Sequence, residues 1–331
     1  RAERQADAKG ADANPADIDL IESSSTTQDG GVDKITAGDG SDLIVGGRYG
    51  DLIEAGGGNN LVIGDSGRMT AGSSDGAQLS GIPMTFGLVE TLESGDGGSD
   101  SITTGTGIDI ILGGQGADTI IANSGEAAGT PDGGNVILGD NGKLDYTRAD
   151  RMSTAGADID PADLDLVESV DEGIGGDDLI TTGNGSDLVI GGAGSDTITL
   201  NEGNNLALGD SGRITAANVD GPQLSGLPMT FGEVLTTADG IGDSDTMTAG
   251  NGNDILVGGT NAAGGAQETL SAGGGNNLVL GDSGRIDYAR AERQADAKGA
   301  DANPADIDLI ESSSTTQDGG VDKITAGDGS D

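Results

Sequence analysis

The sequence contains no cysteine, no histidine and no tryptophan, and its 331 residues include only three tyrosines and two phenylalanines. Without cysteine, disulfide bonds cannot stabilise the fold in any compartment. Histidine, the commonest general base, and cysteine, a strong nucleophile, are both missing. No other catalytic constellation is visible, so we expect no enzymatic activity. So few aromatic side chains also exclude a large aromatic core. The chain needs a source of stability other than that of an ordinary globular domain.

Positive charge is scarce as well: 15 lysine and arginine residues face 57 acidic residues, which gives a net charge of −42. Such a charge repels nucleic acid and anionic membranes, and we expect neither as a partner. No apolar run approaches the ~20 residues of a membrane helix, so we expect no direct membrane insertion. High charge combined with 64 glycines is typical of a disordered chain. Cations must neutralise the acidic residues before this chain can fold.

Glycine and aspartate are abundant because they recur in one nine-residue pattern. The pattern is Gly-x-Gly-x-Asp followed by three residues with an apolar centre, and two copies adjoin each other at 183–190 and 192–199. The glycines permit a tight turn with positive φ, and the aspartate adds a carboxylate to a ring of backbone carbonyl oxygens. An all-oxygen ring suits a hard cation such as Ca²⁺. We therefore expect short strands that are separated by calcium-binding turns, with two nonapeptides in each coil of about eighteen residues.

These nonapeptides resemble those of the RTX family of calcium-binding proteins, and the resemblance covers roughly half of the chain. It implies an all-β fold, a parallel β-roll or β-helix solenoid with calcium-binding turns, which the longer inserted excursions of this chain would interrupt. It also implies type I secretion in an unfolded state, folding on calcium, and a location outside the cell or on a bacterial cell surface. The long repeats look like those of giant repeat adhesins and surface fibre proteins.

Two longer repeats contain the nonapeptides. Residues 1–42 are identical to residues 290–331, so the chain holds one period of 289 residues and the start of the next. Within the period a Gly-Asp pair followed by a basic residue recurs at positions 64, 139, 209 and 281, which defines four modules of about 72 residues. The predicted boundaries are 1–29 for the end of the preceding repeat, 30–94, 95–172, 173–239 and 240–318 for the modules, and 319–331 for the start of the next period.

Each module carries four nonapeptides, and the residue that ends each turn is the candidate calcium ligand. In the last nonapeptide of every module this residue is asparagine, which either binds more weakly or shares a site that aspartate of the adjacent coil completes. Asn135 and Glu268 follow irregular, longer turns and are not assigned as ligands. The predicted calcium ligands are Asp33, Asp42, Asp51, Asn60, Asp100, Asp109, Asp118, Asp178, Asp187, Asp196, Asn205, Asp245, Asp254 and Asn277.

The basic residues that follow the Gly-Asp pairs have two interpretations. Arg68, Lys143, Arg213 and Arg285 either pair with a nearby aspartate where no metal fits, or are solvated.

Excursions of two kinds separate the modules. The first kind, at 75–93 and 220–237, shares the motif Gln-Leu-Ser-Gly-(Ile/Leu)-Pro-Met-Thr-Phe-Gly and contains both phenylalanines, so we expect a packed, hairpin-like flap. The second kind, at 145–169 and 287–312, contains Pro-Ala-Asp. Its second copy is compatible with a short helix at 288–298 and then an extended segment.

Odd-numbered and even-numbered nonapeptides differ in the two residues that flank the strand centre. These flanking residues should point out of the coil. In the even-numbered nonapeptides all sixteen are apolar, whereas in the odd-numbered ones only three of sixteen are apolar. One of the two sheets is therefore expected to be buried on both faces, because an apolar strip of this size is a liability in water. Either the excursions of the same chain or a neighbouring chain must cover it.

The function expected from these features is structural. The chain would be a repeat unit of an extracellular, calcium-stabilised fibre or surface filament. Its expected partner is the same repeat, joined end to end through tandem periods, and lateral contacts with neighbouring chains are a further option. With eight to twelve coils, one period would extend the rod by roughly 40 to 60 Å. One alternative is the passive stalk of a giant RTX adhesin whose binding domain lies elsewhere. Another is a calcium-dependent export and folding appendage of a secreted enzyme.

Overall fold

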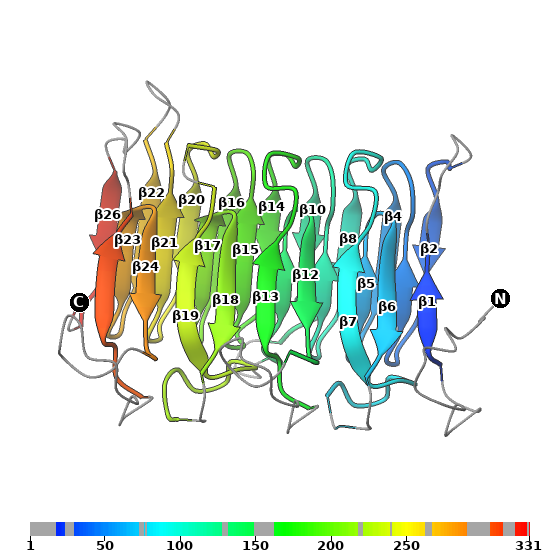
Figure 1. The fold of residues 1–331 in the computed structure, drawn as a ribbon, viewed down its shortest axis with the longest axis horizontal. Helices are drawn as coiled ribbons and strands as arrows, with labels where there is room; N and C mark the ends of the chain where they lie inside the picture. Colours follow the sequence, from blue (N-terminus) through cyan, green and yellow to red (C-terminus); the bar gives the residue numbers. More distant parts are fainter. Residues whose placement is uncertain are drawn as a thin grey trace.

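A computed structural model of the chain describes residues 18–23, 30–72, 76, 78–127, 132–148, 162–217, 221–238, 240–261, 267–289, 305–313, 322–329 and 331. In these ranges the chain forms 26 strands in three sheets, which lie side by side along one rod (Figure 1). These residues include no helix long and apolar enough to cross a membrane. The predicted helix at 288–298 lies almost entirely outside the described residues.

Two of the three sheets are parallel and form the coils of a solenoid. The strand of each odd-numbered nonapeptide enters one sheet, here the odd sheet, and that of each even-numbered nonapeptide enters the other, the even sheet. The odd sheet consists of β2 (Lys34–Thr36), β4 (Leu52–Gly56), β8 (Ser101–Thr104), β10 (Thr119–Ile121), β14 (Leu179–Thr181), β16 (Thr197–Asn201), β20 (Thr246–Ala249), β22 (Thr269–Gly273) and β26 (Lys323–Ala326). The even sheet consists of β3 (Leu43–Val45), β5 (Leu61–Ile63), β9 (Ile110–Leu112), β11 (Val136–Leu138), β15 (Leu188–Gly192), β17 (Leu206–Asp210), β21 (Ile255–Gly259) and β23 (Leu278–Asp282).

The register of the parallel strands follows the nonapeptide. Ile120 at the centre of β10 pairs with the central Ile102 of β8 on one side and the central Ile180 of β14 on the other. The central side chains of both sheets face each other and form an inner core of small and medium aliphatic residues. The prediction of a parallel solenoid with two nonapeptides per coil is therefore confirmed.

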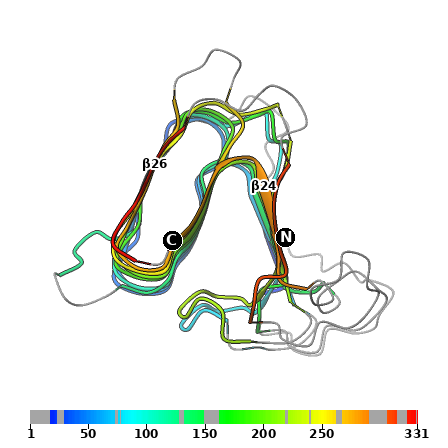
Figure 2. The ribbon, with the colours of Figure 1, turned by 90° about the vertical axis from the view of Figure 1, so that its left-hand side faces the viewer.

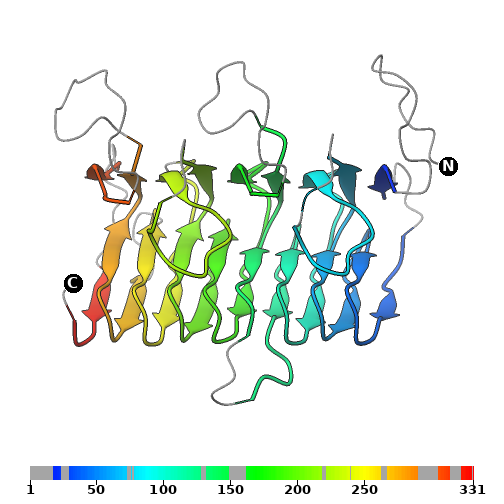
Figure 3. The same ribbon diagram turned by 90° about the horizontal axis from the view of Figure 1, so that it is seen from below.

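The third sheet, here the cover sheet, is antiparallel and lies on the outer face of the even sheet (Figure 2). At each Gly-Asp pair the chain leaves the even sheet, forms two strands of the cover sheet and returns to the next odd strand, at regular intervals along the rod (Figure 3). The strands are β1 (Leu20–Glu22), β6 (Gly67–Ala71), β7 (Phe86–Thr91), β12 (Gly142–Asp145), β13 (Leu166–Ser169), β18 (Gly212–Ala216), β19 (Phe231–Thr236), β24 (Gly284–Asp287) and β25 (Leu309–Ser312).

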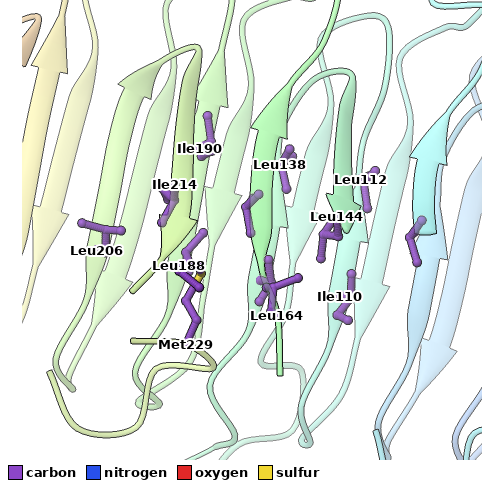
Figure 4. Close-up of a cluster of buried hydrophobic side chains, with 14 of the residues drawn as sticks. Ile110, Leu112, Leu138, Leu144, Leu164, Leu188, Ile190, Leu206, Ile214 and Met229 are labelled. Carbon is purple, nitrogen blue, oxygen red and sulfur yellow. The ribbon is translucent and has the colours of Figure 1, made fainter. Parts of the chain in front are cut away.

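An outer core fills the space between the even sheet and the cover sheet. The outward-facing residues of the even strands, such as Leu188 and Ile190, pack against cover-sheet residues such as Leu144 and Ile214 (Figure 4). Both phenylalanines lie here, and Phe231 makes a ring contact with a tyrosine of the neighbouring excursion. Of the two covers expected for this apolar face, the excursions of the same chain are the one that the structure shows.

A glutamine side chain explains the motif that precedes each phenylalanine. The Gln223 amide accepts a hydrogen bond from the backbone N–H of Phe231 at 2.7 Å and donates one to the Phe231 carbonyl at 2.8 Å. Gln78 makes the same pair of bonds with Phe86. The amide thus takes the place of a neighbouring strand where the sheet ends, which fixes the flap over the outer core.

The basic residues after the Gly-Asp pairs form a row of alternating charge on the outer face of the cover sheet. Glu90 lies between Arg68 and Lys143 on its two neighbouring strands, and Glu168 lies between Lys143 and Arg213. The Lys143 ammonium lies 3.1 Å from the Glu168 carboxylate. Most partners of the basic residues are glutamates of the cover sheet: Arg68, Lys143 and Arg213 pair with Glu90, Glu168 and Glu233. Arg285 also forms an ion pair with Asp287 at 2.7 Å, so the expected pairing with a nearby aspartate holds for Arg285.

Candidate metal sites

The turns that join odd and even strands stack along the two edges of the coil. Turns that lead into odd strands form the odd edge, and turns that lead into even strands form the even edge. At each edge the last residue of the turn binds its counterpart one coil away: Asp100 donates its backbone N–H to Oδ1 of Asp118 at 2.7 Å, and Asp118 donates in the same way to Asp178. This arrangement gives two ladders of acidic and amide side chains, one at each edge of the rod.

The odd-edge ladder is acidic throughout, whereas aspartate and asparagine alternate along the even-edge ladder. Backbone N–H to Oδ1 bonds join the members in order. The odd ladder contains Asp33, Asp51, Asp100, Asp118, Asp178, Asp196 and Asp245. The even ladder contains Asp42, Asn60, Asp109, Asn135, Asp187, Asn205, Asp254, Asn277 and Asp331.

Glycine is required in these turns because successive turns are in backbone contact. Gly203 has φ of 115°, and a Cβ built on it would lie only 1.8 Å from the carbonyl oxygen of Gly185 in the preceding coil. The same close approach recurs at the odd edge, where a Cβ on Gly64 would lie 2.4 Å from the carbonyl oxygen of Gly113 and 2.1 Å from Oδ2 of Asp100. Carbonyl and carboxylate oxygens therefore share the small space that the glycines leave.

Nine of the predicted aspartate ligands hold a second oxygen that is buried. Each of these side chains is at most 3% exposed, and Oδ2 has no hydrogen-bond partner within the described part of the chain. Burying an ionised carboxylate oxygen without a partner costs several kcal/mol, on the order of the penalty for any unpaired buried charge. The nine residues are Asp51, Asp100, Asp109, Asp118, Asp178, Asp187, Asp196, Asp245 and Asp254.

The acidities of these carboxyl groups reflect the missing partner. Burial raises the pKa of Asp100 to about 8, and burial together with the neighbouring Asp178 raises that of Asp118 to about 10. At the even edge, burial raises the pKa of Asp109 to about 6 and that of Asp187 to about 7. At neutral pH each of these carboxyl groups therefore either holds a proton or needs a cation nearby to compensate its charge.

A calcium ion fits the chemistry of these turns. Among the described residues no three acidic side chains converge closely enough to hold a metal by themselves. A ligand set of one or two ladder carboxylates with backbone carbonyl oxygens of the glycine turns matches the all-oxygen preference of Ca²⁺. When bound, the ion would supply the positive charge that the buried Oδ2 atoms lack. The ladder aspartates would hold it, and the glycines would let the carbonyl oxygens reach it.

The asparagines of the even ladder differ from the aspartates. The Asn60 amide nitrogen donates to the carbonyl oxygen of Gly58 at 3.0 Å, and that of Asn205 donates to Gly203 at 3.3 Å and to Oδ1 of Asp254 at 3.0 Å. A neutral donor thus occupies turn oxygens that a cation would use. Calcium binding at Asn60, Asn205 and Asn277 stays a prediction, and this geometry makes it weaker than at the aspartates.

The remaining predicted ligands lie at the end of the rod. Asp33 and Asp42 belong to the first described coil, where Asp33 is exposed and Asp42 is half-buried. Their backbone N–H groups join the ladders through Asp51 and Asn60. In the described part of the chain they have a neighbouring coil on one side only. Each therefore has one ladder neighbour, whereas an inner aspartate has two.

Sequence reasoning left out two sets of acidic residues that the structure brings to the odd edge. Glu268 is 0% exposed, neither of its carboxylate oxygens has a partner among the described residues, and burial raises its pKa to about 9. Asp65 of the first Gly-Asp pair accepts the backbone N–H groups of Gly98 and Gln115 from two successive odd turns. Asp140 repeats this arrangement in the second module. The signal available was the recurrence of the Gly-Asp pair in all four modules.

Comparison with known proteins agrees with this geometry. A family model for the RTX calcium-binding nonapeptide repeat, which spans four copies, matches residues 29–68, 94–126, 172–207, 239–262 and 263–285. Neither the curated proteins nor the solved structures gave a match. The matched segments hold the ladder aspartates and omit the cover-sheet excursions. The nonapeptide turns are therefore calcium-binding motifs, and all four modules of the chain contain RTX calcium-binding repeats.

Proposed function

We propose that this chain is a structural repeat unit of an extracellular, calcium-stabilised filament or surface fibre, in which 289-residue periods continue one another as a single rod. RTX repeats are typical of secreted extracellular proteins, which supports a location outside the cell, at the surface of a bacterium. In this proposal calcium is a folding ligand, because it binds the stacked turns and not the unfolded chain.

The observation that carries the proposal is the strand that begins the second period. β26 has the sequence of β2, since residues 323–325 repeat residues 34–36. It pairs in parallel with β22, with Ile324 opposite the central Leu270, as neighbouring strands do within the period. The step from one period to the next thus uses the same register as the steps inside a period, and no linker separates the periods in the odd sheet.

The cover sheet supports the same continuity from both sides of one strand. β25 pairs with the preceding β24 through Ile310 and Ile286, whereas β1, which repeats β25, pairs with the following β6 through Ile21 and Met69. In a tandem chain, this strand can therefore pair with the preceding period through one edge and with the following period through the other. Its glutamate, which is Glu22 in β1 and Glu311 in β25, continues the alternation of charge across the boundary.

The length of the rod follows from the coil count. One period contains eight even strands and therefore eight coils, the lower end of the expected range. At ~4.8 Å per strand step, each period adds about 38 Å to the rod.

A chain extended by one further 289-residue period tests the proposal. In calcium, we expect electron microscopy and small-angle scattering to show one straight rod that is about 38 Å longer than the 331-residue chain. Two blocks joined by a flexible hinge would contradict a continuous rod.

The alternative of a passive adhesin stalk has one observation in its favour. The apolar face of the even sheet is covered by the chain's own excursions, so lateral assembly through that face is not needed. Rods that stay single in saturating calcium would favour the stalk, whereas regular lateral bundles would favour the filament. An adjoining catalytic domain would instead favour the appendage of a secreted enzyme.

A further inference from the structure

The residues inserted before Asn135 bring an additional carboxylate to the even edge. Asp132 occupies the position three residues before the ladder residue, and its Oδ1 accepts the backbone N–H of Gly107 at 2.6 Å and that of Gly133 at 2.8 Å. Gly107 belongs to the preceding even turn, 105–109. The side chain therefore links its own turn to the turn one coil earlier.

The other oxygen of Asp132 faces the next turn. A Cβ built on Gly183, in the turn 183–187, would lie 2.9 Å from Oδ2 of Asp132. This oxygen is buried and has no hydrogen-bond partner in the residues that the structure describes. The carboxylate thus lies between the turns that end at Asp109 and Asp187.

Both of these ladder aspartates also have a buried oxygen without a hydrogen-bond partner. Asp109 and Asp187 are each 0% exposed, and the Oδ2 atom of each lacks a partner in the described ranges. Asp132 is close enough to raise the pKa of both carboxyl groups, in addition to the larger effect of burial. Asp132 therefore lies on the even edge between two ladder aspartates that each have an unsatisfied oxygen, although the three carboxylates do not converge closely enough to hold a metal without backbone oxygens.

Asn135 differs from the other ladder asparagines at this point. The Asn60 amide nitrogen donates to the carbonyl oxygen of Gly58 in its own turn. The amide nitrogen of Asn135, in contrast, donates to no carbonyl oxygen of its own turn, although the side chain is 0% exposed. The Asn135 side chain lies close enough to Asp187 to lower the pKa of that carboxyl group, against the larger effect of burial. The carbonyl oxygens of Gly107 and Gly133, which lie in the glycine row of this edge, are not occupied by that amide.

We propose that Asp132 is a calcium ligand from outside the nonapeptide pattern, and that it completes a site between Asp109 and Asp187 together with the glycine carbonyl oxygens. The inserted loop would in this way restore the charge that Asn135 removes from the ladder. The proposal rests on calcium binding by the turns and not on the filament role, so the two fail independently.

Glu126 is a positioning residue for this site. Its Oε1 accepts the backbone N–H of Asp132 at 3.1 Å and the side-chain amide of Asn184 at 2.6 Å. It thereby connects the Asp132 backbone to the following turn through these two hydrogen bonds.

Asp132→Asn in the full chain tests the proposal. Asparagine keeps the Oδ1 acceptor for Gly107 and Gly133 and removes the charge at the buried oxygen. We expect native mass spectrometry to show one calcium ion fewer per chain, or calorimetry to show one site weakened by about tenfold or more, because carboxylate count sets calcium affinity. The matched control is Asp39→Asn, the same position of the turn 38–42, which is exposed and should change neither reading. An unchanged count with unchanged affinities in Asp132→Asn would overturn the proposal.

A second measurement uses the unaltered chain, so that it does not depend on the folding of a variant. In crystals grown with calcium and then exchanged with a lanthanide, we expect an anomalous peak about 2.3–2.6 Å from Oδ2 of Asp132. Peaks at Asp109 and Asp187 that leave the Asp132 carboxylate outside the coordination sphere, or no peak at this turn, would contradict the assignment.

Discussion

Asp118 and Asp100 are joined across one step of the odd edge by a 2.7 Å hydrogen bond from the Asp100 backbone N–H to Oδ1 of Asp118. The other oxygen of Asp118 is buried and has no partner in the described part of the chain. One carboxylate therefore has two tasks: it connects neighbouring coils through the first oxygen, and we expect it to bind a cation through the second. Without the cation, the first task remains and the second becomes a repeated electrostatic cost along the whole rod.

This cost predicts that the metal-free chain folds better in mild acid than at neutral pH. The pKa values of the ladder aspartates are raised in the fold, to about 6 for Asp109 and about 8 for Asp100, whereas the unfolded value is 3.8. The folded state then binds more protons than the unfolded state between these values, so stability falls as pH rises from about 4 to about 8. Circular dichroism in chelator should show more β-structure at pH 5 than at pH 8. Calcium should abolish this dependence, and an equal or weaker β signal at pH 5 would contradict the prediction.

Asp118→Asn should separate the two tasks of the ladder carboxylate. Asparagine keeps an oxygen for the Asp100 N–H but carries no charge, and the pKa of Asp118, raised by burial and by Asp178, is about 10 in the fold. We expect the metal-free chain at pH 7 to gain about 3 kcal/mol of stability, because folding no longer forces a carboxyl group that is ionised in the unfolded chain to take up a proton. The calcium-bound chain should lose one ion.

Chemical denaturation with and without calcium measures the change in stability of Asp118→Asn, and native mass spectrometry counts the bound ions. Asp39→Asn, at an exposed turn position, serves as the control. A loss of stability in the metal-free variant would show that the charge itself is not a burden.

Asn205→Asp should have the opposite effect at the even edge. The Asn205 amide donates to Oδ1 of Asp254 and to the Gly203 carbonyl oxygen, and an aspartate would place an acceptor against both. We expect a loss of about 1–3 kcal/mol without metal, and one additional calcium ion per chain by native mass spectrometry. Asn253→Asp adds the same charge at an exposed neighbouring position and should do neither.

Phe231→Ala should release the cover sheet from the outer core. Phe231 is fully buried, and its ring centroid lies 6.1 Å from that of Tyr288. The truncation should cost about 3–5 kcal/mol of unfolding free energy in saturating calcium, measured by denaturant titration. Tyr49→Ala removes an aromatic ring that is 41% exposed and should cost much less. Equal costs would show that the cover sheet adds little stability.

Gly203→Ala should disrupt the even edge even when calcium is saturating. The methyl group would meet the Gly185 carbonyl oxygen at 1.8 Å from a backbone with φ of 115°, so two coils must separate. We expect a loss of about 2 kcal/mol or more, seen as a lower melting temperature. Gly31→Ala has open space around the added methyl group, and little change is expected there.

The nine-residue pattern was sufficient to predict the coil, the division into two sheets and the ladder aspartates, because all of them depend on residues that are close in sequence. It also predicted that the even sheet needs a cover, since apolar residues flank the centre of every even strand. The antiparallel pairing of that cover depends on contacts between excursions, as in the pairing of Lys143 with Glu90, and no local pattern encodes them.

The acidic residues that sequence reasoning missed have the same explanation. Asp65 binds Gly98 and Gln115, which lie 33 and 50 residues further along the chain. Asn60 could be recognised as a ladder member from its position, but the direction of its amide toward the Gly58 carbonyl oxygen is a property of the folded turn. Glu268 follows a turn of irregular length, so its side chain reaches the odd edge without matching the nonapeptide.

The cover sheet constrains how a protein of this design can change its length. Every excursion adds two antiparallel strands for every two even strands beneath it, so both layers lengthen at the same rate. Gain of a lone coil would leave one even strand without a cover strand above it, and loss of one would leave a cover strand without an even strand beneath it. Evolution can therefore lengthen or shorten this rod only in whole pairs of coils, each pair together with its excursion.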